Sequence, residues 1–371
     1  MTTTLSRMSA AQDPTTPFKR RVLSGAMIVI ALIVVLYFLW QAVYVLLLIF
    51  AGILLAVLLR TLAEYLHAWT RLPIGWSLAV VCATLLGGLA LLVWLGAPPL
   101  SKQFEELADD LPRAVESLKA RVAQYKWGAW FVANAPTTQQ VAERGQRILL
   151  RSPGALTTAF SAIVAVITIA FVAVYLAAEP ELYTNGVLRL VPKQHREHGA
   201  RVLASVRYTL QWWLIGQGIT MIVIGVLIGA GLWLIGVPLW FLLGLLAALF
   251  NFIPNFGPFV SYIPSVLLAL AIGPSAAIWV TVLFIVAQSF EGYLLTPLVQ
   301  RKAVLLPPAL TITTQVLLGI LVGILGVMLA APLTAAVLVV VKMLYVEEVL
   351  GDEMHTPDEK MPRSELPRVP R

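Results

Sequence analysis

The sequence predicts an all-α polytopic membrane protein, and three observations support this class. Of the 371 residues, 59% are hydrophobic and 12% are charged, and the mean hydropathy is +0.87. A soluble domain usually carries about 25% charged residues. The single cysteine, Cys82, excludes a disulfide-stabilised secreted fold. Long stretches without Asp, Glu, Lys or Arg cover residues 22–59, 72–101, 152–178, 208–290 and 303–341, and each can span a bilayer.

The first uncharged stretch predicts a membrane hairpin that is not cleaved. A basic cluster at 19–21 precedes it, as in a signal peptide, but no A-x-A-like site follows. A second apolar segment begins after Gln41. We therefore expect a cytoplasmic N-terminal tail over 1–21 and the first three transmembrane helices over 22–97.

The distribution of Lys and Arg orients the predicted spans. If the 19–21 cluster is cytoplasmic, the loop around Arg60 and the loop at 189–207 are also inside. All but 8 of the 26 Lys and Arg residues then lie inside, as the positive-inside rule requires. Both termini are expected in the cytoplasm. These flanking charges account for the net charge of +7 without a nucleic-acid partner.

Four further segments follow from apolar periodicity and composition. Apolar residues at steps of three and four predict an extracytoplasmic amphipathic helical region over 98–152. We expect the fourth transmembrane helix at 153–178 and a cytoplasmic linker helix at 179–210. The segment 346–371 combines four prolines with dense charge, which predicts a disordered cytoplasmic tail.

The remaining transmembrane core, 211–345, contains a broken hairpin at 239–272. Its apolar arms, 239–250 and 259–272, are about 18 and 21 Å long as helices, too short to cross about 30 Å of hydrocarbon. The sequence NFIPNFGP separates them, and its prolines and glycine interrupt the helix while its asparagines can pair with free backbone groups. Such a break can form a solute site, whereas the alternative is a proline kink packed inside a bundle. The candidate residues are Asn251, Pro254, Asn255, Gly257 and Pro258.

Glu291 is the only charged residue within the predicted spans. A carboxylate in the membrane costs a few kcal/mol, so it should face the protein interior, pair with another group or be protonated. Such a group suits proton coupling or the binding of a monovalent cation. The alternative is a neutral carboxyl hydrogen-bonded to Gln288 or to the broken hairpin. Gln288, Glu291 and Pro297 complete the predicted solute or ion pathway.

Two glycine pairs and a second hairpin complete the core. Gly225 with Gly229, and Gly319 with Gly323, match the GxxxG spacing that allows helices to approach closely, so helix packing is expected. The uncharged stretch 303–341 predicts a second hairpin that enters from the face opposite to the first. Such an inverted pair is a known basis of alternating access.

The motifs of the core resemble those of the autoinducer-2 exporter family, also called PerM-like permeases. The similarity is carried by the GVP turn at 236–238, the N-x-I-P-x-x-G-P tip that begins at Asn251, the E-G-x-x-x-x-P stretch from Glu291 to Pro297, and the late A-P pair at 331–332. This resemblance implies about eight transmembrane helices, an extracytoplasmic helical insertion, a bacterial inner-membrane location and a homo-oligomer. It also implies export of autoinducer-2 or, as in other members, Na⁺(Li⁺)/H⁺ antiport.

Three functions remain open at this stage. The first is a secondary-active transporter that exports a small polar solute, the second is a cation/proton antiporter that uses Glu291, and the third is a membrane scaffold without transport. A nucleotide-binding G-x-x-x-x-G-K-[ST] motif is absent. We expect no enzyme activity, no metal and no cofactor beyond coupled H⁺ or Na⁺. The expected partners are lipid, the solute or a monovalent cation, and further copies of the chain.

Overall fold

The computed structural model describes residues 16–88, 155–299 and 306–347, together with isolated positions between 90 and 116. These residues form helices and no β-strand, which confirms the predicted all-α class. The chain divides into two units, Met1–Leu47 and Leu48–Arg371. All contacts discussed below lie in the second unit. The predicted helical region at 98–152 falls almost wholly outside the described residues, as does the predicted tail from 348 onward.

By length and composition, four described helices can cross a membrane, and a bent pair makes a fifth. The four are Gln41–Thr70, Lys193–Ile235, Pro274–Leu298 and Ile324–Glu347, and the pair is Ile163–Ala178 with Pro180–Arg189. Four shorter apolar helices, Ile74–Gly88, Trp240–Phe250, Gly257–Ile272 and Pro308–Val322, accompany them. The protein is therefore a multi-pass membrane protein, and the total of about eight crossings stays a prediction.

The first predicted hairpin is replaced by one continuous helix, α1 (Thr16–Thr70). We expected a turn near Gln41, but the helix continues through this residue. The physical reason is that no proline or glycine lies between Gly25 and Gly52, and one glutamine in an apolar run is compatible with a helix. The helix Ile74–Gly88 follows after a short connection.

A proline and a glycine set the ends of the next helices. α5 (Ala155–Ala178) is followed by α6 (Pro180–Arg189), which begins with Pro180 at its first turn, and the two are bent by 89°. After the short η1 (Lys193–His195), α7 (Arg196–Ile235) continues unbroken for 40 residues from the predicted linker into the core. Gly236 ends α7 with a positive φ of 82°, the conformation that glycine adopts most easily.

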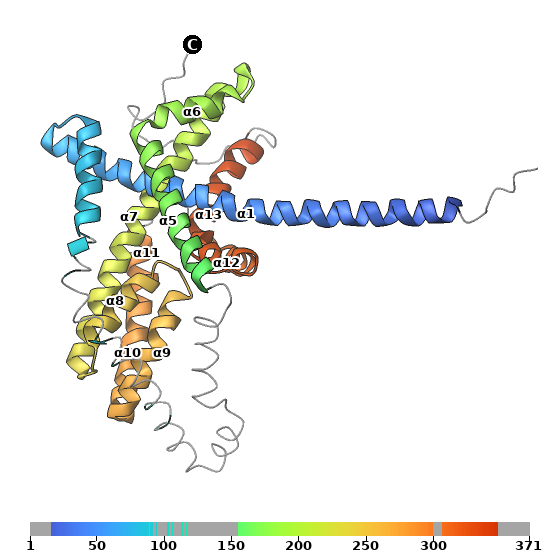
Figure 1. Cartoon of the computed structure of the whole chain (residues 1–371). Helices are drawn as coiled ribbons and strands as arrows, with labels where there is room; N and C mark the ends of the chain where they lie inside the picture. Colours follow the sequence, from blue (N-terminus) through green and yellow to red (C-terminus); the bar gives the residue numbers. More distant parts are fainter. Residues whose placement is uncertain are drawn as a thin grey trace, which may run out of the picture. The chain divides into compact units, whose positions relative to one another are not determined.

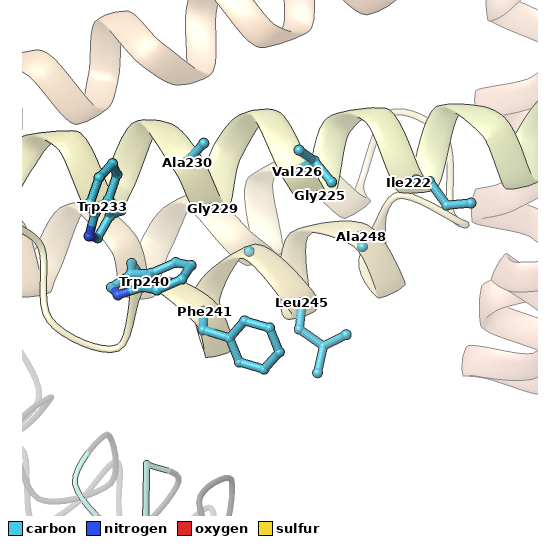
Figure 2. A pocket seen from close by; sticks show the side chains of 11 residues that line it. Ile222, Gly225, Val226, Gly229, Ala230, Trp233, Trp240, Phe241, Leu245 and Ala248 are labelled. Carbon is cyan, nitrogen blue, oxygen red and sulfur yellow. The ribbon is translucent and has the colours of Figure 1, made fainter. Parts of the chain in front are cut away.

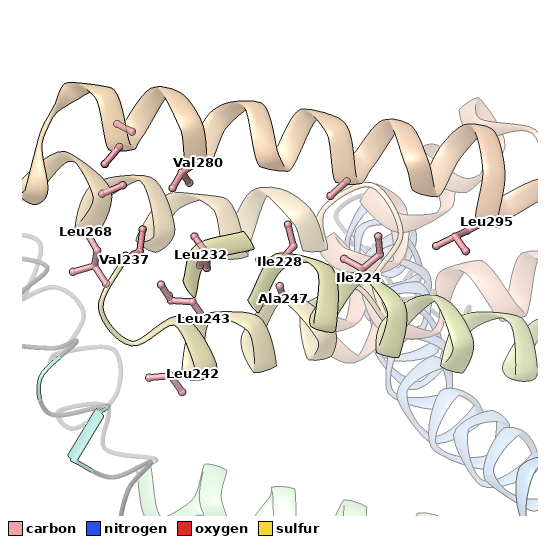
Figure 3. Packing of buried hydrophobic residues seen from close by; sticks show 14 residues of the cluster. Ile224, Ile228, Leu232, Val237, Leu242, Leu243, Ala247, Leu268, Val280 and Leu295 are labelled. Carbon is pink, nitrogen blue, oxygen red and sulfur yellow. The ribbon is translucent and has the colours of Figure 1, made fainter. Parts of the chain in front are cut away.

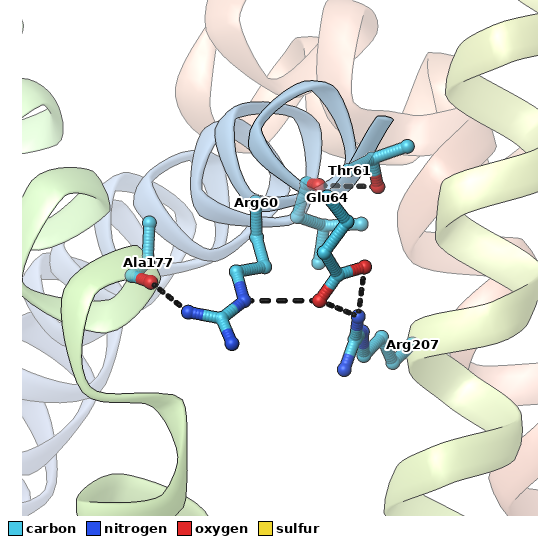
Figure 4. Close-up of polar contacts among 6 residues, drawn as sticks. Arg60, Thr61, Glu64, Ala177 and Arg207 are labelled. Atoms are coloured by element: carbon cyan, nitrogen blue, oxygen red, sulfur yellow. Dashed lines mark hydrogen bonds and ion pairs between the residues drawn. The ribbon is translucent and has the colours of Figure 1, made fainter. Parts of the chain in front are cut away.

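Charged side chains connect α1, α5 and α7 (Figure 4). The Arg60 guanidinium donates to Glu64 Oε1 at 2.9 Å and to the Ala177 carbonyl at 3.2 Å. Arg207 Nη2 donates to both Glu64 carboxylate oxygens at 2.8 Å. Arg60 and Arg207 therefore lie close together. The side of the membrane on which they lie stays a prediction, because the continuous α1 removes one of the two crossings that were counted before Arg60.

Four helices surround the main apolar core: α7, α8 (Trp240–Phe250), α9 (Gly257–Ile272) and α10 (Pro274–Phe290). They lie side by side in Figure 1. Fully buried residues fill the space between them, as Figure 3 shows for Leu232, Leu243, Leu268 and Val280. Because lipid tails are as apolar as leucine, these residues stabilise the bundle through close packing rather than through removal from water.

α7 and α8 touch backbone to backbone along a line of small residues that we call the glycine seam: Gly225, Gly229, Gly244 and Ala248. A Cβ on Gly244 would lie 2.7 Å from the Gly229 Cα, and a Cβ on Gly225 would lie 2.6 Å from the Ala248 Cβ. The GxxxG pair of α7 thus lies against α8. Beside the seam is an apolar groove of about 780 Å³, with Trp233 and Trp240 near one end (Figure 2).

The second hairpin consists of α12 (Pro308–Val322) and α13 (Ile324–Val341), and η4 (Lys342–Glu347) continues α13 as a π-helical segment. Gly319 packs close to Val327, since a Cβ would lie 2.8 Å from its Cγ2. The assignment of Gly323 to helix packing is wrong. Gly323 forms the turn between the two helices with a φ of +76°, and apart from its chain neighbours no atom of the described residues lies within 4 Å of its Cβ position.

Candidate functional site

The predicted break in the first hairpin is present and forms a tight turn. α8 ends at Phe250 and α9 begins at Gly257, and we call the intervening residues 251–256 the tip. A Cβ on Gly257 would lie 1.9 Å from the Phe250 carbonyl oxygen, so the return of the chain requires glycine. Asn255 adopts a φ of +70°, which asparagine tolerates better than most residues. The tip therefore folds back closely on the end of α8.

The tip brings Asn251 to Glu291. The Asn251 side chain is 1% exposed, and its Nδ2 donates to Glu291 Oε1 at 3.1 Å. The other carboxylate oxygen, Oε2, is buried and has no hydrogen-bond partner among the described residues. An acceptor in this situation is costly unless a proton, a cation or a donor reaches it. The geometry thus pairs the carboxyl with the broken hairpin, one of the two partners expected for a neutral carboxyl.

Glu291 begins a π-helical segment, η2 (Glu291–Leu295), between α10 and α11 (Thr296–Val299). Pro297 has no N–H group and so cannot continue the α-helical ladder. Both the backbone N–H and the Oγ1 of Thr296 donate to the Glu291 carbonyl, the latter at 2.9 Å. π-Helical segments occur frequently at functional sites. We predicted Pro297 as part of the pathway but not the helix type that accompanies it.

A small, partly open cavity lies beside the Glu291 carboxyl, and one of its lining residues, Gln288, is exposed. Its polar lining includes Asn251, Ser261, Gln288 and Glu291, and Pro258 contributes from the start of α9. Residues of α7, α8 and α10 provide the apolar walls: Ile224, Ile228, Ala247, Phe284 and Ala287. The space for the centre of a water molecule is about 10 Å³, roughly what one water needs. In this conformation the cavity can therefore hold a proton, a water or a dehydrated ion, whereas a larger solute requires movement of the hairpin.

Two glutamines that the sequence analysis did not select complete the site. Gln217 Nε2 on α7 donates to the Asn251 carbonyl at 2.6 Å, and Gln315 Nε2 on α12 donates to the Pro254 carbonyl at 2.8 Å. Gln217 is 6% exposed and Gln315 is fully buried. Each is a polar residue within a long uncharged stretch. This position was the signal in the sequence that could have marked the two glutamines as candidates. We call Gln217, Asn251, Glu291 and Gln315 the polar junction.

The predicted pathway residues fall into three groups. Asn251, Pro258, Gln288 and Glu291 line one cavity, while Pro254 and Gly257 shape the tip. Asn255 and Pro297 are exposed and do not line this cavity. The structure thus brings four of the eight predicted residues together around one cavity. The transport roles of all eight stay predictions.

Comparison with known sequences identifies the family. Residues 27–345 match the sequence model described as AI-2E family transporter. The chain belongs to the AI-2E transporter family. This confirms the resemblance found in the core motifs, and it makes the protein a membrane transporter of this family.

Several relatives of the AI-2E transporter have names that describe transport. The proposed transport protein YrrI of Bacillus subtilis (strain 168) is 27% identical over 76% of this chain and 82% of its own length. The proposed transport protein YueF of the same organism is 24% identical over 72% and 76% of the two chains. The proposed permease PerM of Escherichia coli (strain K12) is 27% identical over 79% and 87%. Each match covers most of both chains.

Proposed function

We propose that this AI-2E transporter is secondary-active and exports a small polar solute, with autoinducer-2 as the first candidate, through the site at Asn251 and Glu291. The observation that carries the proposal is a carboxyl within a helix that is long and apolar enough to cross a membrane. It is hydrogen-bonded to the tip of a broken hairpin and has one buried oxygen without a partner among the described residues. Ionisable groups inside membranes mark ion and substrate pathways, and broken helices form solute sites in many transporters.

The chemistry follows from the two oxygens of Glu291. Oε1 is held by Asn251, while Oε2 faces surroundings that offer it no hydrogen-bond donor among the described residues. Binding of a proton or a cation neutralises the carboxylate and lowers the cost of its burial. Loss of that ligand favours an arrangement in which the carboxylate meets water or the hydrogen-bond donors of a solute. Alternation between these arrangements couples an ion gradient to movement of the hairpin.

Na⁺(Li⁺)/H⁺ antiport is the second candidate, and the size of the cavity favours it. A space of about 10 Å³ accepts about one water-sized ligand. The side-chain oxygens of Asn251, Ser261 and Glu291 near it are the hard ligands that an alkali cation prefers. Export of a furanone requires the tip to withdraw first, whereas a small ion fits without a large displacement.

Flux measurements in proteoliposomes test both candidates with the wild-type protein and the Glu291→Gln variant. We expect autoinducer-2 flux, or Na⁺-dependent proton movement, to fall to the level of empty liposomes in Glu291→Gln. The Glu64→Gln variant, which also removes one carboxylate but lies outside the polar junction, serves as the control. Furanone flux without Na⁺ favours export, and Na⁺-dependent proton movement favours antiport. Unchanged flux in Glu291→Gln contradicts the site.

A further inference from the structure

The tip has backbone carbonyls that a continuous helix would have paired internally. In an unbroken helix the Pro254 carbonyl would accept the amide of residue 258, but Pro258 has no N–H group. The Asn251 carbonyl would accept the amide of Asn255, which instead adopts the left-handed conformation. A carbonyl that is buried without a donor destabilises the structure. The break therefore leaves the Asn251 and Pro254 carbonyls without the hydrogen bonds that a continuous helix would give them, so donors from other helices can reach them.

Two buried glutamines from different helices supply those bonds. Gln217 on α7 donates to the Asn251 carbonyl, and Gln315 on α12 donates to the Pro254 carbonyl. Pro254 also accepts the amide of Phe256 at 2.9 Å, which closes a local turn. The tip is thus attached on one side to α7, which packs on α8 through the glycine seam, and on the other side to the second hairpin.

We propose that Gln217 and Gln315 are positioning residues that hold the tip closed and thereby keep Asn251 against Glu291. The inference rests on the proposed function of Glu291, and it adds which residues control access to that site. Gln217 fixes the main chain of the same residue whose side chain reaches the carboxylate. Gln315 makes the attachment depend on the second hairpin, so movement of α12 changes the site on the first hairpin.

The surroundings of the two hydrogen bonds differ, and the difference shows which bond breaks first when the tip is released. The Gln217 bond joins α7 to the end of α8, two helices whose backbones touch along the seam. The Gln315 bond joins α12 to the tip, and the Oε1 of Gln315 is buried without a partner among the described residues. A half-satisfied amide gains from an arrangement in which both of its ends are bonded. Release of Pro254 by Gln315 is therefore the step that frees the tip and enlarges the small cavity.

Hydrogen–deuterium exchange on the full-length protein in nanodiscs tests the attachment directly. The Gln315→Met variant keeps a long flexible side chain but removes the donor, and Gln217→Met does the same on α7. In each variant we expect the backbone amides of 252–257, other than Pro254, which has none, to exchange about tenfold faster, since one buried hydrogen bond no longer opposes local opening. Thr314→Val, one residue from Gln315 with only a local hydrogen bond to Leu310, is the matched control and should leave the tip unchanged.

A second measurement follows the consequence for Glu291. Reaction of its carboxyl with a hydrophobic carbodiimide is quantified by mass spectrometry of the peptide that contains it, over a range of pH. We expect Gln315→Met to label several-fold faster, with a shifted pH profile, and Thr314→Val to match the wild type. If Gln315→Met does not fold, the Gln315→Asn variant is used instead, because it moves the amide donor back by one methylene.

The outcomes separate this proposal from the proposed function. Tip exchange at the wild-type rate in both glutamine variants overturns the attachment, and unchanged labelling of Glu291 overturns the positioning role. Neither measurement needs a known solute. Absence of flux in the proteoliposome assay together with altered exchange and labelling would instead contradict the transport function and leave the positioning of the tip established.

Discussion

The glycine seam and the polar junction involve the same short helix, α8, yet they hold it in opposite ways. Along the seam, Gly244 contacts Gly229 so closely that a single added carbon has no room. At the junction, directly after the end of α8, side-chain hydrogen bonds hold the chain, and two buried oxygens have no partner among the described residues. Backbone contacts are lost when helices shift, whereas hydrogen bonds can exchange partners. From this comparison we expect α7 and α8 to move as one body, with the tip moving relative to them.

The largest effect is expected at the glycine seam, which the Gly244→Ala variant tests. Its Cβ would lie 2.7 Å from the Gly229 Cα and 3.1 Å from the Gly225 carbonyl oxygen, so the two backbones must separate. We expect the free energy of unfolding, measured by denaturation in mixed micelles, to fall by about 2–3 kcal/mol. Gly218→Ala lies on α7, where the described residues outside the local helix backbone have no atom within 4 Å of the new Cβ. It should be neutral or stabilising by up to about 1 kcal/mol. If Gly244→Ala is as stable as the wild type, α7 and α8 can separate along the glycine seam without loss of stability.

The junction is tested next by Asn251→Ala. This change removes the donor to Glu291 Oε1 at a side chain that is almost fully buried, so we expect the free energy of unfolding to fall by about 2 kcal/mol. A double-mutant cycle with Glu291→Ala should give a coupling energy of about 1 kcal/mol. Strictly additive effects of the two substitutions would mean that the observed contact contributes no stability.

A smaller effect is expected at the π-helical segment. Thr296→Val keeps the shape of the side chain and removes the hydroxyl that donates to the Glu291 carbonyl, so stability should fall by about 1 kcal/mol. Thr314→Val, whose hydroxyl bonds an exposed carbonyl one helical turn earlier, should change stability by less than about 0.5 kcal/mol. Equal losses in the two variants would show that the hydroxyl near Glu291 has no special role.

The smallest effect is expected at the charged contact between α1 and α7. Glu64→Gln removes the negative charge that Arg60 and Arg207 contact and leaves one amide oxygen as an acceptor. Because these side chains are 19–46% exposed, the loss of stability should be below about 1 kcal/mol. Thermal unfolding in detergent at low and at 1 M salt measures it, and the difference from wild type should shrink at high salt because of screening. A larger loss of stability that does not depend on salt would show that this contact, like the glycine seam, contributes through close packing and not through exposed charges.

The sequence was informative where the chemistry is local and less so where it depends on tertiary contacts. The broken hairpin could be predicted because NFIPNFGP removes donors within one segment, and Glu291 could be singled out because a lone carboxylate in an apolar run is costly. Gln217 and Gln315 escaped selection because their importance lies in carbonyls 34 and 61 residues away. The predicted turn near Gln41 failed because a change in polarity does not break a helix in the way that proline does.

The neutral character of the two glutamines has an electrical consequence. Between residues 208 and 299, Glu291 is the only charged side chain, so release of the tip by amide groups displaces no net charge. A membrane potential acts with about 2.3 kcal/mol per elementary charge per 100 mV, and it therefore has little influence on the release itself. The voltage dependence of turnover then reports the charge carried by Glu291 and its occupant, and a current recording can count that charge without knowledge of what the occupant is.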